Sequence, residues 1–127
     1  MGKGWLLVEV GGDTEDEARD KAERLARSVR SILRSPSIKV YADKERQKEI
    51  WEIRESGLGS TAFVPGQPDA WPGWEDSAVP PERVGDYLRE LRKLLDAHGY
   101  KASLYGHFGQ GCIHTRIPFD LRSKEGI

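Results

Sequence analysis

The chain is poor in most of the features that assign a protein quickly to a common class. Its 127 residues include a single cysteine, which excludes an internal disulfide and is typical of a reducing cytoplasm. Lys and Arg total 20 against 21 for Asp and Glu, so no basic excess indicates nucleic acid or an anionic membrane surface as a partner. No apolar run approaches a transmembrane span, and the first residues lack the apolar core of a signal peptide. We therefore expect a cytoplasmic domain without membrane insertion.

Common catalytic motifs are absent as well. The sequence contains no Gly-x-Gly-x-x-Gly after a predicted strand, no Walker loop, no His-Glu-x-x-His and no Gly-x-Ser-x-Gly. The length predicts one domain, residues 1–127, with one sizeable core. The polar segment 120–127 does not look like the natural end of a domain, so we expect the chain to be a fragment of a larger protein.

What the chain does contain is an alternation of strand-like and helix-like patterns. Apolar runs predict strands, and apolar stripes at three- and four-residue steps predict helices. The predicted strands lie at 5–10, 38–41, 104–105 and 113–119, and the predicted helices at 14–33, 43–55 and 81–98. A capping box at Thr14 to Glu17 opens the first helix. This order is typical of an α+β ferredoxin-like sandwich, with an antiparallel sheet and helices packed on one face.

Residues 57–74 are rich in Gly, Pro and Trp and show no sustained period. An irregular connection of this length in a compact domain is usually functional or disordered, and its tryptophans argue against disorder. We expect an ordered excursion that packs either against another domain or against the core of this one.

The residues most capable of chemistry are concentrated at 105–119. If Gln110-Gly111 forms a two-residue hairpin turn, His107 and His114 face each other across two strands. Two imidazoles in that position could bind one divalent cation together with a third ligand from elsewhere. Alternatively, the two rings stack on each other or bond to the backbone.

The lone thiol is a candidate nucleophile because two histidines lie within a few residues of it. In the predicted register, however, Cys112 faces Gly109 and points away from both imidazoles. We therefore expect no thiol mechanism.

Three segments resemble one family. Residues 106–114, Gly-His-Phe-Gly-Gln-Gly-Cys-Ile-His, resemble the Gly-His-x-Gly-Asp-Gly-Asn-x-His signature of the FAD-linked 2-hydroxyacid dehydrogenases. This family belongs to the vanillyl-alcohol oxidase superfamily and includes glycolate oxidase, D-lactate dehydrogenase and D-2-hydroxyglutarate dehydrogenase. Residues 51–55, Trp-Glu-Ile-Arg-Glu, resemble its Trp-x-Ile-Arg-Glu segment, and residues 76–80 its Asp-x-Ala-Val-Pro strand. Gln110 and Cys112 depart from the usual Asp and Asn, and Arg116 stands where a further Asn is common.

The resemblance implies that this chain is a fragment of the substrate-side, or cap, domain of an enzyme that oxidises a 2-hydroxy acid. FAD would be bound mainly by another domain of the parent chain. His107 and His114 would hold a divalent metal such as Zn or Mn, and Arg54 would bind the substrate carboxylate. Arg116 indicates extra anionic character in the substrate, or else pairs with a nearby acid. The family's third metal ligand and catalytic base lie in a Glu-His motif that is absent here, so we expect no catalytic residue within the fragment.

Other interpretations stay open. The chain could be a free-standing ferredoxin-like module that binds a small molecule or dimerises, or a metal-binding regulatory domain without flavin. By spacing alone, Arg54 is more simply a surface residue paired with Glu52 or Glu55. His98 is more simply a residue at the end of a helix, favoured by the helix dipole, than a ligand.

Overall fold

The computed structural model describes residues 4–33, 37–71 and 76–127. The chain divides into two compact units, Met1–Glu52 and Ile53–Ile127, where the sequence predicted one domain. Each unit is described by itself below.

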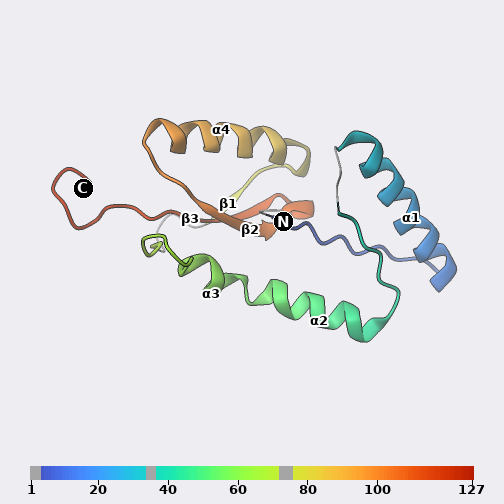
Figure 1. The fold of residues 1–127 in the computed structure, drawn as a ribbon. Helices are drawn as coiled ribbons and strands as arrows, with labels where there is room; N and C mark the ends of the chain where they lie inside the picture. Colours follow the sequence, from blue (N-terminus) through green and yellow to red (C-terminus); the bar gives the residue numbers. More distant parts are fainter. Residues whose placement is uncertain (1–3, 34–36, 72–75) are drawn as a thin grey trace. The chain divides into compact units, whose positions relative to one another are not determined.

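The N-terminal unit is dominated by one helix, α1 (Glu15–Ile32), shown in Figure 1. The Thr14 hydroxyl accepts a hydrogen bond from the Glu17 backbone N–H at 3.2 Å, as the capping box predicts. The Glu17 carboxylate accepts from the backbone N–H of Asp13, at 2.8 Å, and so reaches one residue further back than expected. Ala26 is the buried residue of this helix.

The two strands predicted for the N-terminal unit are wrong. Residues 5–10 and 38–41 have no regular secondary structure, and the side chains of Trp5 and Leu6 are 82% and 71% exposed. An apolar run shows that a segment could be buried. A strand forms only when a neighbouring strand accepts and donates its backbone hydrogen bonds. Within the described part of the chain, neither segment has such a neighbour.

Helix α2 (Lys44–Glu55) agrees with the predicted helix at 43–55. Its start is stabilised by Asp43, whose carboxylate accepts from the Arg46 backbone N–H at 2.8 Å. A further short helix, α3 (Gly57–Ala62), occupies the start of the stretch predicted as irregular. Beyond it the chain turns at Gly66, and the Trp71 backbone N–H donates to the carbonyl of Ile117 at 3.3 Å. Residues 72–74 of the predicted excursion lie outside the described residues.

The C-terminal unit contains a three-stranded antiparallel sheet in the order β1-β3-β2. The strands are β1 (Asp76–Ala78), β2 (Ser103–His107) and β3 (Cys112–Arg116). Between β1 and β2 run a short turn of 3-10 helix, η1 (Pro81–Arg83), and the helix α4 (Val84–Ala97). A second 3-10 turn, η2 (Phe108–Gln110), joins β2 to β3.

Helix α4 ends as its sequence predicts. Gly99 adopts φ +72°, and the backbone N–H of Tyr100 donates to the Leu95 carbonyl at 2.9 Å, which is the pattern of a glycine-terminated helix. His98 is the residue that caps this end, in agreement with its interpretation as a helix-end residue.

The sheet has a helix on each side, because α4 lies along one face and α3 along the other (Figure 1). A Cβ added at Gly57 in α3 would lie 3.8 Å from the ring of Tyr105 in β2, so α3 contacts the sheet closely. Among the described residues of this unit, the buried apolar ones are Leu91, Ile113 and Ile117. The predicted α+β class with an antiparallel sheet is confirmed. The ferredoxin-like arrangement is not confirmed, because the sheet lacks the two N-terminal strands and carries helices on both sides instead of one.

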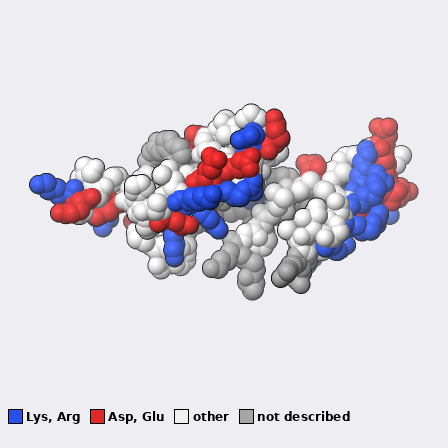
Figure 2. All heavy atoms as spheres, turned by 90° about the horizontal axis from the view of Figure 1, so that it is seen from above, with Lys and Arg blue, Asp and Glu red and all other residues white. Residues whose placement is uncertain are grey.

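Acidic and basic side chains lie next to one another in the view of Figure 2. In α1 the ammonium of Lys21 lies 2.8 Å from the Glu17 carboxylate, and in α4 Asp86 pairs with Arg83 and Arg89. These surfaces are solvated ion-pair networks without an excess of either sign. Within the described ranges, no helix is both long enough and apolar enough to cross a membrane.

Candidate functional site

The hairpin at 103–116 is formed as expected, but the predicted register is wrong. His107 is opposite Cys112, and Tyr105 is opposite His114. The prediction assumed a two-residue turn at Gln110-Gly111, whereas the chain turns over Phe108 to Gly111 through the 3-10 turn η2. The longer turn shifts the pairing by two residues, so the two histidines are diagonal neighbours instead of directly opposed.

Gly111 fixes this turn. It adopts φ +77°, and a Cβ at this position would lie 1.8 Å from the carbonyl oxygen of Val79. The same two residues are bonded through their backbones, since the Val79 N–H donates to the Gly111 carbonyl at 3.0 Å. A residue without a side chain is therefore required where the hairpin turn meets the end of β1.

The observed register also changes the face of the sheet on which the Cys112 thiol lies. Because Cys112 is directly opposite His107 and two residues before His114, it shares a face of the sheet with both histidines. The argument that Cys112 points away from them is therefore wrong. Its sulfur lies 3.9 Å from the carbonyl oxygen of Gln110, and among the described residues it has no hydrogen bond to an imidazole.

His114 is held between the two neighbouring strands. Asp76 in β1 is its direct cross-strand partner, and the Asp76 Oδ1 atom is hydrogen-bonded to Nδ1 of His114. From β2, the ring of Tyr105 stacks on the imidazole with 4.6 Å between centroids and 25° between planes. Two independent contacts therefore orient this ring.

His107 lies at the end of β2, beside both His114 and Arg54. The two imidazole centroids are 6.1 Å apart, with the rings nearly perpendicular. The Nη2 atom of Arg54 lies 3.2 Å from Nε2 and 3.4 Å from Nδ1 of His107. The last turn of α2 thus brings a guanidinium to His107. Among the described residues, Arg54 forms no ion pair with Glu52 or Glu55.

Arg116 lies further along β3, on the same face by alternation, and it is 6% exposed. Its cross-strand partner is Ser103. A charged group this deeply buried is already engaged within the protein, and Arg116 does take part in such an interaction. The structure therefore groups Arg54, His107 and His114, and gives Arg116 a buried position on β3.

The residues present fit a divalent metal in part. A metal-binding imidazole commonly donates its other ring N–H to a carboxylate, which is the relation of His114 to Asp76. In the part of the chain that the structure describes, however, no three side chains of His, Cys, Asp or Glu converge as a complete ligand set. The donor set is thus two imidazoles at most, with a guanidinium beside one of them.

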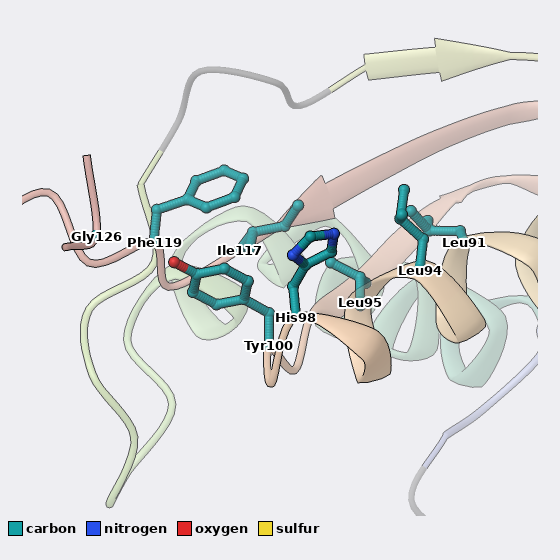
Figure 3. Close-up of a pocket in the computed structure, with 8 residues that line it drawn as sticks. All are labelled: Leu91, Leu94, Leu95, His98, Tyr100, Ile117, Phe119 and Gly126. Atoms are coloured by element: carbon teal, nitrogen blue, oxygen red, sulfur yellow. The ribbon is translucent and has the colours of Figure 1, made fainter.

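An apolar hollow lies elsewhere in this unit, against α4. Its volume is about 390 Å³, and Figure 3 shows the leucines of α4 across from the rings of Tyr100 and Phe119. These two rings meet edge to face at 5.3 Å. Among the described residues that line it there is no carboxylate, lysine or arginine. Apart from the imidazole of His98 and the hydroxyl of Tyr100, its lining side chains are apolar and suited to packing.

Two residues of the site escaped the sequence analysis, namely Asp76 and Tyr105. The segment 76–80 and the strand ending at Tyr105 were both recognised, but neither side chain was connected with His114. Only the β1–β3 pairing, over 38 residues of sequence, places Asp76 beside that ring. The alternation of β2 would have placed Tyr105 correctly if the turn had been assigned its true length.

Comparison with known proteins agrees with the resemblance. The whole chain, residues 1–127, matches the family described as FAD linked oxidases, C-terminal domain. It is 28% identical to D-2-hydroxyglutarate dehydrogenase of Haemophilus influenzae, over 98% of this chain and 13% of that protein. It is 25% identical to the mitochondrial D-lactate dehydrogenase [cytochrome] of Kluyveromyces lactis, over 94% of this chain and 21% of that protein.

A third relative is glycolate oxidase subunit GlcD of Bacillus subtilis, 24% identical over 97% of this chain and 25% of the relative. The chain thus spans between an eighth and a quarter of the length of these relatives. No solved structure matches it. Because the family match covers every residue, the chain belongs to the C-terminal domain family of the FAD linked oxidases.

Proposed function

We propose that this chain is part of the substrate-side, or cap, domain of an FAD-dependent enzyme that oxidises a 2-hydroxy acid. The relatives named for D-2-hydroxyglutarate, D-lactate and glycolate support a 2-hydroxy acid as the substrate. FAD, when bound by another domain of the parent protein, would supply the acceptor for the hydride of the substrate carbon. The described residues would contribute position and electrostatics.

Arg54 would bind the carboxylate of the hydroxy acid. A guanidinium offers two parallel donors that match a carboxylate, and the half-buried Arg54 is held beside His107 by the end of α2. A substrate carboxylate at this point would also compensate the positive charge that Arg54 places next to the imidazole. Because Arg116 is already buried, it would act on the substrate only through its positive charge, without direct contact.

His107 and His114 would provide two ligands of a divalent metal, for which Zn and Mn are both suitable. The third ligand and the catalytic base would come from residues outside this chain. A metal held there would withdraw electron density from the substrate oxygens and fix their position. The role of the two histidines is then to hold the hydroxy acid in one orientation.

One observation supports this proposal above the others. The side chains that the resemblance assigns to substrate and metal, Arg54 and the two histidines, come from segments 53 residues apart and yet meet at one place. A free-standing binding module has no need for this convergence, and no contact among the described residues favours that alternative.

The test is made on the full-length enzyme that carries this chain. Dye reduction is measured with D-2-hydroxyglutarate, D-lactate and glycolate for the wild type, Arg54→Gln and Arg46→Gln. Arg46 is a matched control, because it is an exposed arginine of the same helix paired with Glu49. We expect Arg54→Gln to lower kcat/KM by about 100-fold, the loss of one charge-assisted carboxylate contact of 2–3 kcal/mol. Equal activity of the two variants would contradict the role of Arg54.

The isolated chain should oxidise none of these acids, even with added FAD, because it would lack the flavin domain and the base. Dye reduction by the purified 127-residue chain would show that the proposed division of labour is wrong.

A further inference from the structure

We infer that Asp76 is a positioning residue for His114: it holds the imidazole as the Nδ1–H tautomer and so leaves Nε2 as the nitrogen available to a metal ion. Nothing in the family resemblance assigns this role to Asp76. The inference rests on the proposed function only for the identity of the bound ion, and the orientation of the ring is a property of the chain itself.

The donor must be the imidazole. An ionised carboxylate can only accept hydrogen bonds, so the bond between Asp76 Oδ1 and His114 Nδ1 requires the proton on Nδ1. In neutral imidazole the other nitrogen then carries the lone pair. A free histidine side chain can exchange its proton between the two nitrogens, whereas His114 is restricted to one arrangement by this contact.

The sheet makes this pairing specific. Asp76 and His114 are direct cross-strand partners of β1 and β3, so their side chains leave the sheet on the same face at neighbouring positions. The Asp76 side chain is 75% exposed and that of His114 is 26% exposed. The carboxylate therefore reaches over the ring from the solvent side, and removing it would open no cavity in the core.

Tyr105 completes the restraint. Its ring stacks on His114, and its own position is limited by α3, where Gly57 closely approaches it. Stacking prevents the imidazole from tilting, and the bond to Asp76 prevents it from flipping about its outer torsion. A ring restrained in both ways keeps its second nitrogen pointing in one direction, which is the preorganisation that a metal ligand needs.

The tautomer is measured directly by NMR on the chain labelled with 15N-histidine. Two-bond nitrogen–proton correlations, recorded at an alkaline pH above which the spectrum no longer changes, distinguish Nδ1–H from Nε2–H for each of the three histidines. We expect Nδ1–H for His114 in the wild type and in the control Asp69→Ala, which removes an exposed carboxylate of the same unit. We expect Asp76→Ala to shift His114 toward Nε2–H. An Nε2–H signal for His114 in the wild type would overturn the inference without the need for any variant.

The second measurement uses the full-length enzyme and Zn²⁺ as the probe, in competition with a chromophoric chelator. Asp76→Ala should weaken Zn²⁺ binding by about 10–100-fold, the usual effect of removing a carboxylate behind a ligating histidine. It should have no further effect in a His114→Ala background, because Asp76 acts through that ring. Additive losses would assign Asp76 a separate role and overturn the inference.

The two measurements separate the possible failures. If Zn²⁺ does not bind but His114 shows the Nδ1–H tautomer that depends on Asp76, the metal part of the proposed function fails and the positioning role stands. If Zn²⁺ binds equally well with and without Asp76 while hydroxy acids are oxidised, the proposed function stands and the positioning role is wrong.

Discussion

The two units of the chain are built by different kinds of contact. Between the described residues of the N-terminal unit, side-chain hydrogen bonds join positions at most ten apart, as at Thr14, Glu17 and Asp43. In the C-terminal unit the contacts that define the candidate site join residues 38 and 53 positions apart. The first unit shows what the local sequence can specify by itself, and the second shows what appears only when distant segments pair.

The two units also differ in how far their apolar side chains are buried. The apolar stripe of α1 has one buried member, Ala26, while Ile32 at its end is 76% exposed. In the sheet, Ile113 of the central strand β3 is 1% exposed. We therefore expect stability to depend strongly on the second unit and weakly on the exposed apolar residues of the first.

The largest expected effect is that of Ile113→Ala. Removing a fully buried isoleucine side chain should lower the free energy of unfolding by roughly 2–5 kcal/mol. The matched change in the other unit, Ile32→Ala, should alter it by less than about 0.5 kcal/mol, because that side chain is already in water. Urea unfolding of the chain followed by circular dichroism measures both. Equal losses would show that the stripe of α1 is buried and that the contrast between the units is wrong.

A second change tests the turn that sets the register. Gly111→Ala places a side chain where φ is +77° and where the Val79 carbonyl oxygen leaves no room, so we expect a loss of about 2–3 kcal/mol. Gly109→Ala is the control in the same turn, because nothing lies within 4 Å of its added Cβ and no positive φ is involved. It should change the free energy of unfolding by less than about 1 kcal/mol. If neither change lowers the free energy of unfolding by more than about 1 kcal/mol, the four-residue turn is wrong, and the two-residue turn expected from the sequence describes the hairpin better.

The same turn explains how far the sequence could predict the site. Composition and the family signature identified His107, His114 and Arg54, and the structure brings all three together. The exact pairing depended on whether the turn contained two residues or four, and Gln110-Gly111 suits a two-residue turn equally well. The decisive fact is the approach of Gly111 to Val79, the residue that follows β1, which no local pattern contains. For the same reason Asp76 and the position of Cys112 could not be predicted.

The predicted helices agree with the structure better than the predicted strands do, for a related reason. The helices at 14–33, 43–55 and 81–98 carry their own start signals in the chain, at Thr14, Asp43 and Pro81. A helix satisfies its backbone hydrogen bonds internally, so its sequence is sufficient to specify it. The runs 5–10 and 38–41 have strand-like composition, but their backbone groups need a partner strand, and composition says nothing about whether one is in place.

A smaller effect tests the local character of the first unit. Thr14→Ala removes the side-chain acceptor at the start of α1 and should cost about 1 kcal/mol. Ser28→Ala is the control, because it replaces an exposed serine in the middle of the same helix, where alanine is the better helix former. Amide hydrogen exchange of the first turn of α1 measures the change at the site itself. A loss of protection that reached the strands of the second unit would contradict the separation of the two units.

The smallest effect is expected from acid at the same helix end. Lys21 and the backbone N–H of Asp13 hold the pKa of the Glu17 carboxyl below its usual value of 4.5. Because the folded chain favours the ionised form, the stabilisation is complete above that usual value and is lost as the pH falls through the lower pKa of the folded state. Exchange protection of the Asp13 amide should therefore decrease between about pH 5 and pH 3. Glu17→Gln should remove this pH dependence, whereas Asp20→Asn, at an exposed carboxylate of the same helix, should leave it in place. If the wild type and Glu17→Gln lose protection over the same pH range, a group other than the Glu17 carboxylate causes the pH dependence. The hydrogen bond from the Asp13 N–H to Glu17 would then not be what stabilises the start of α1.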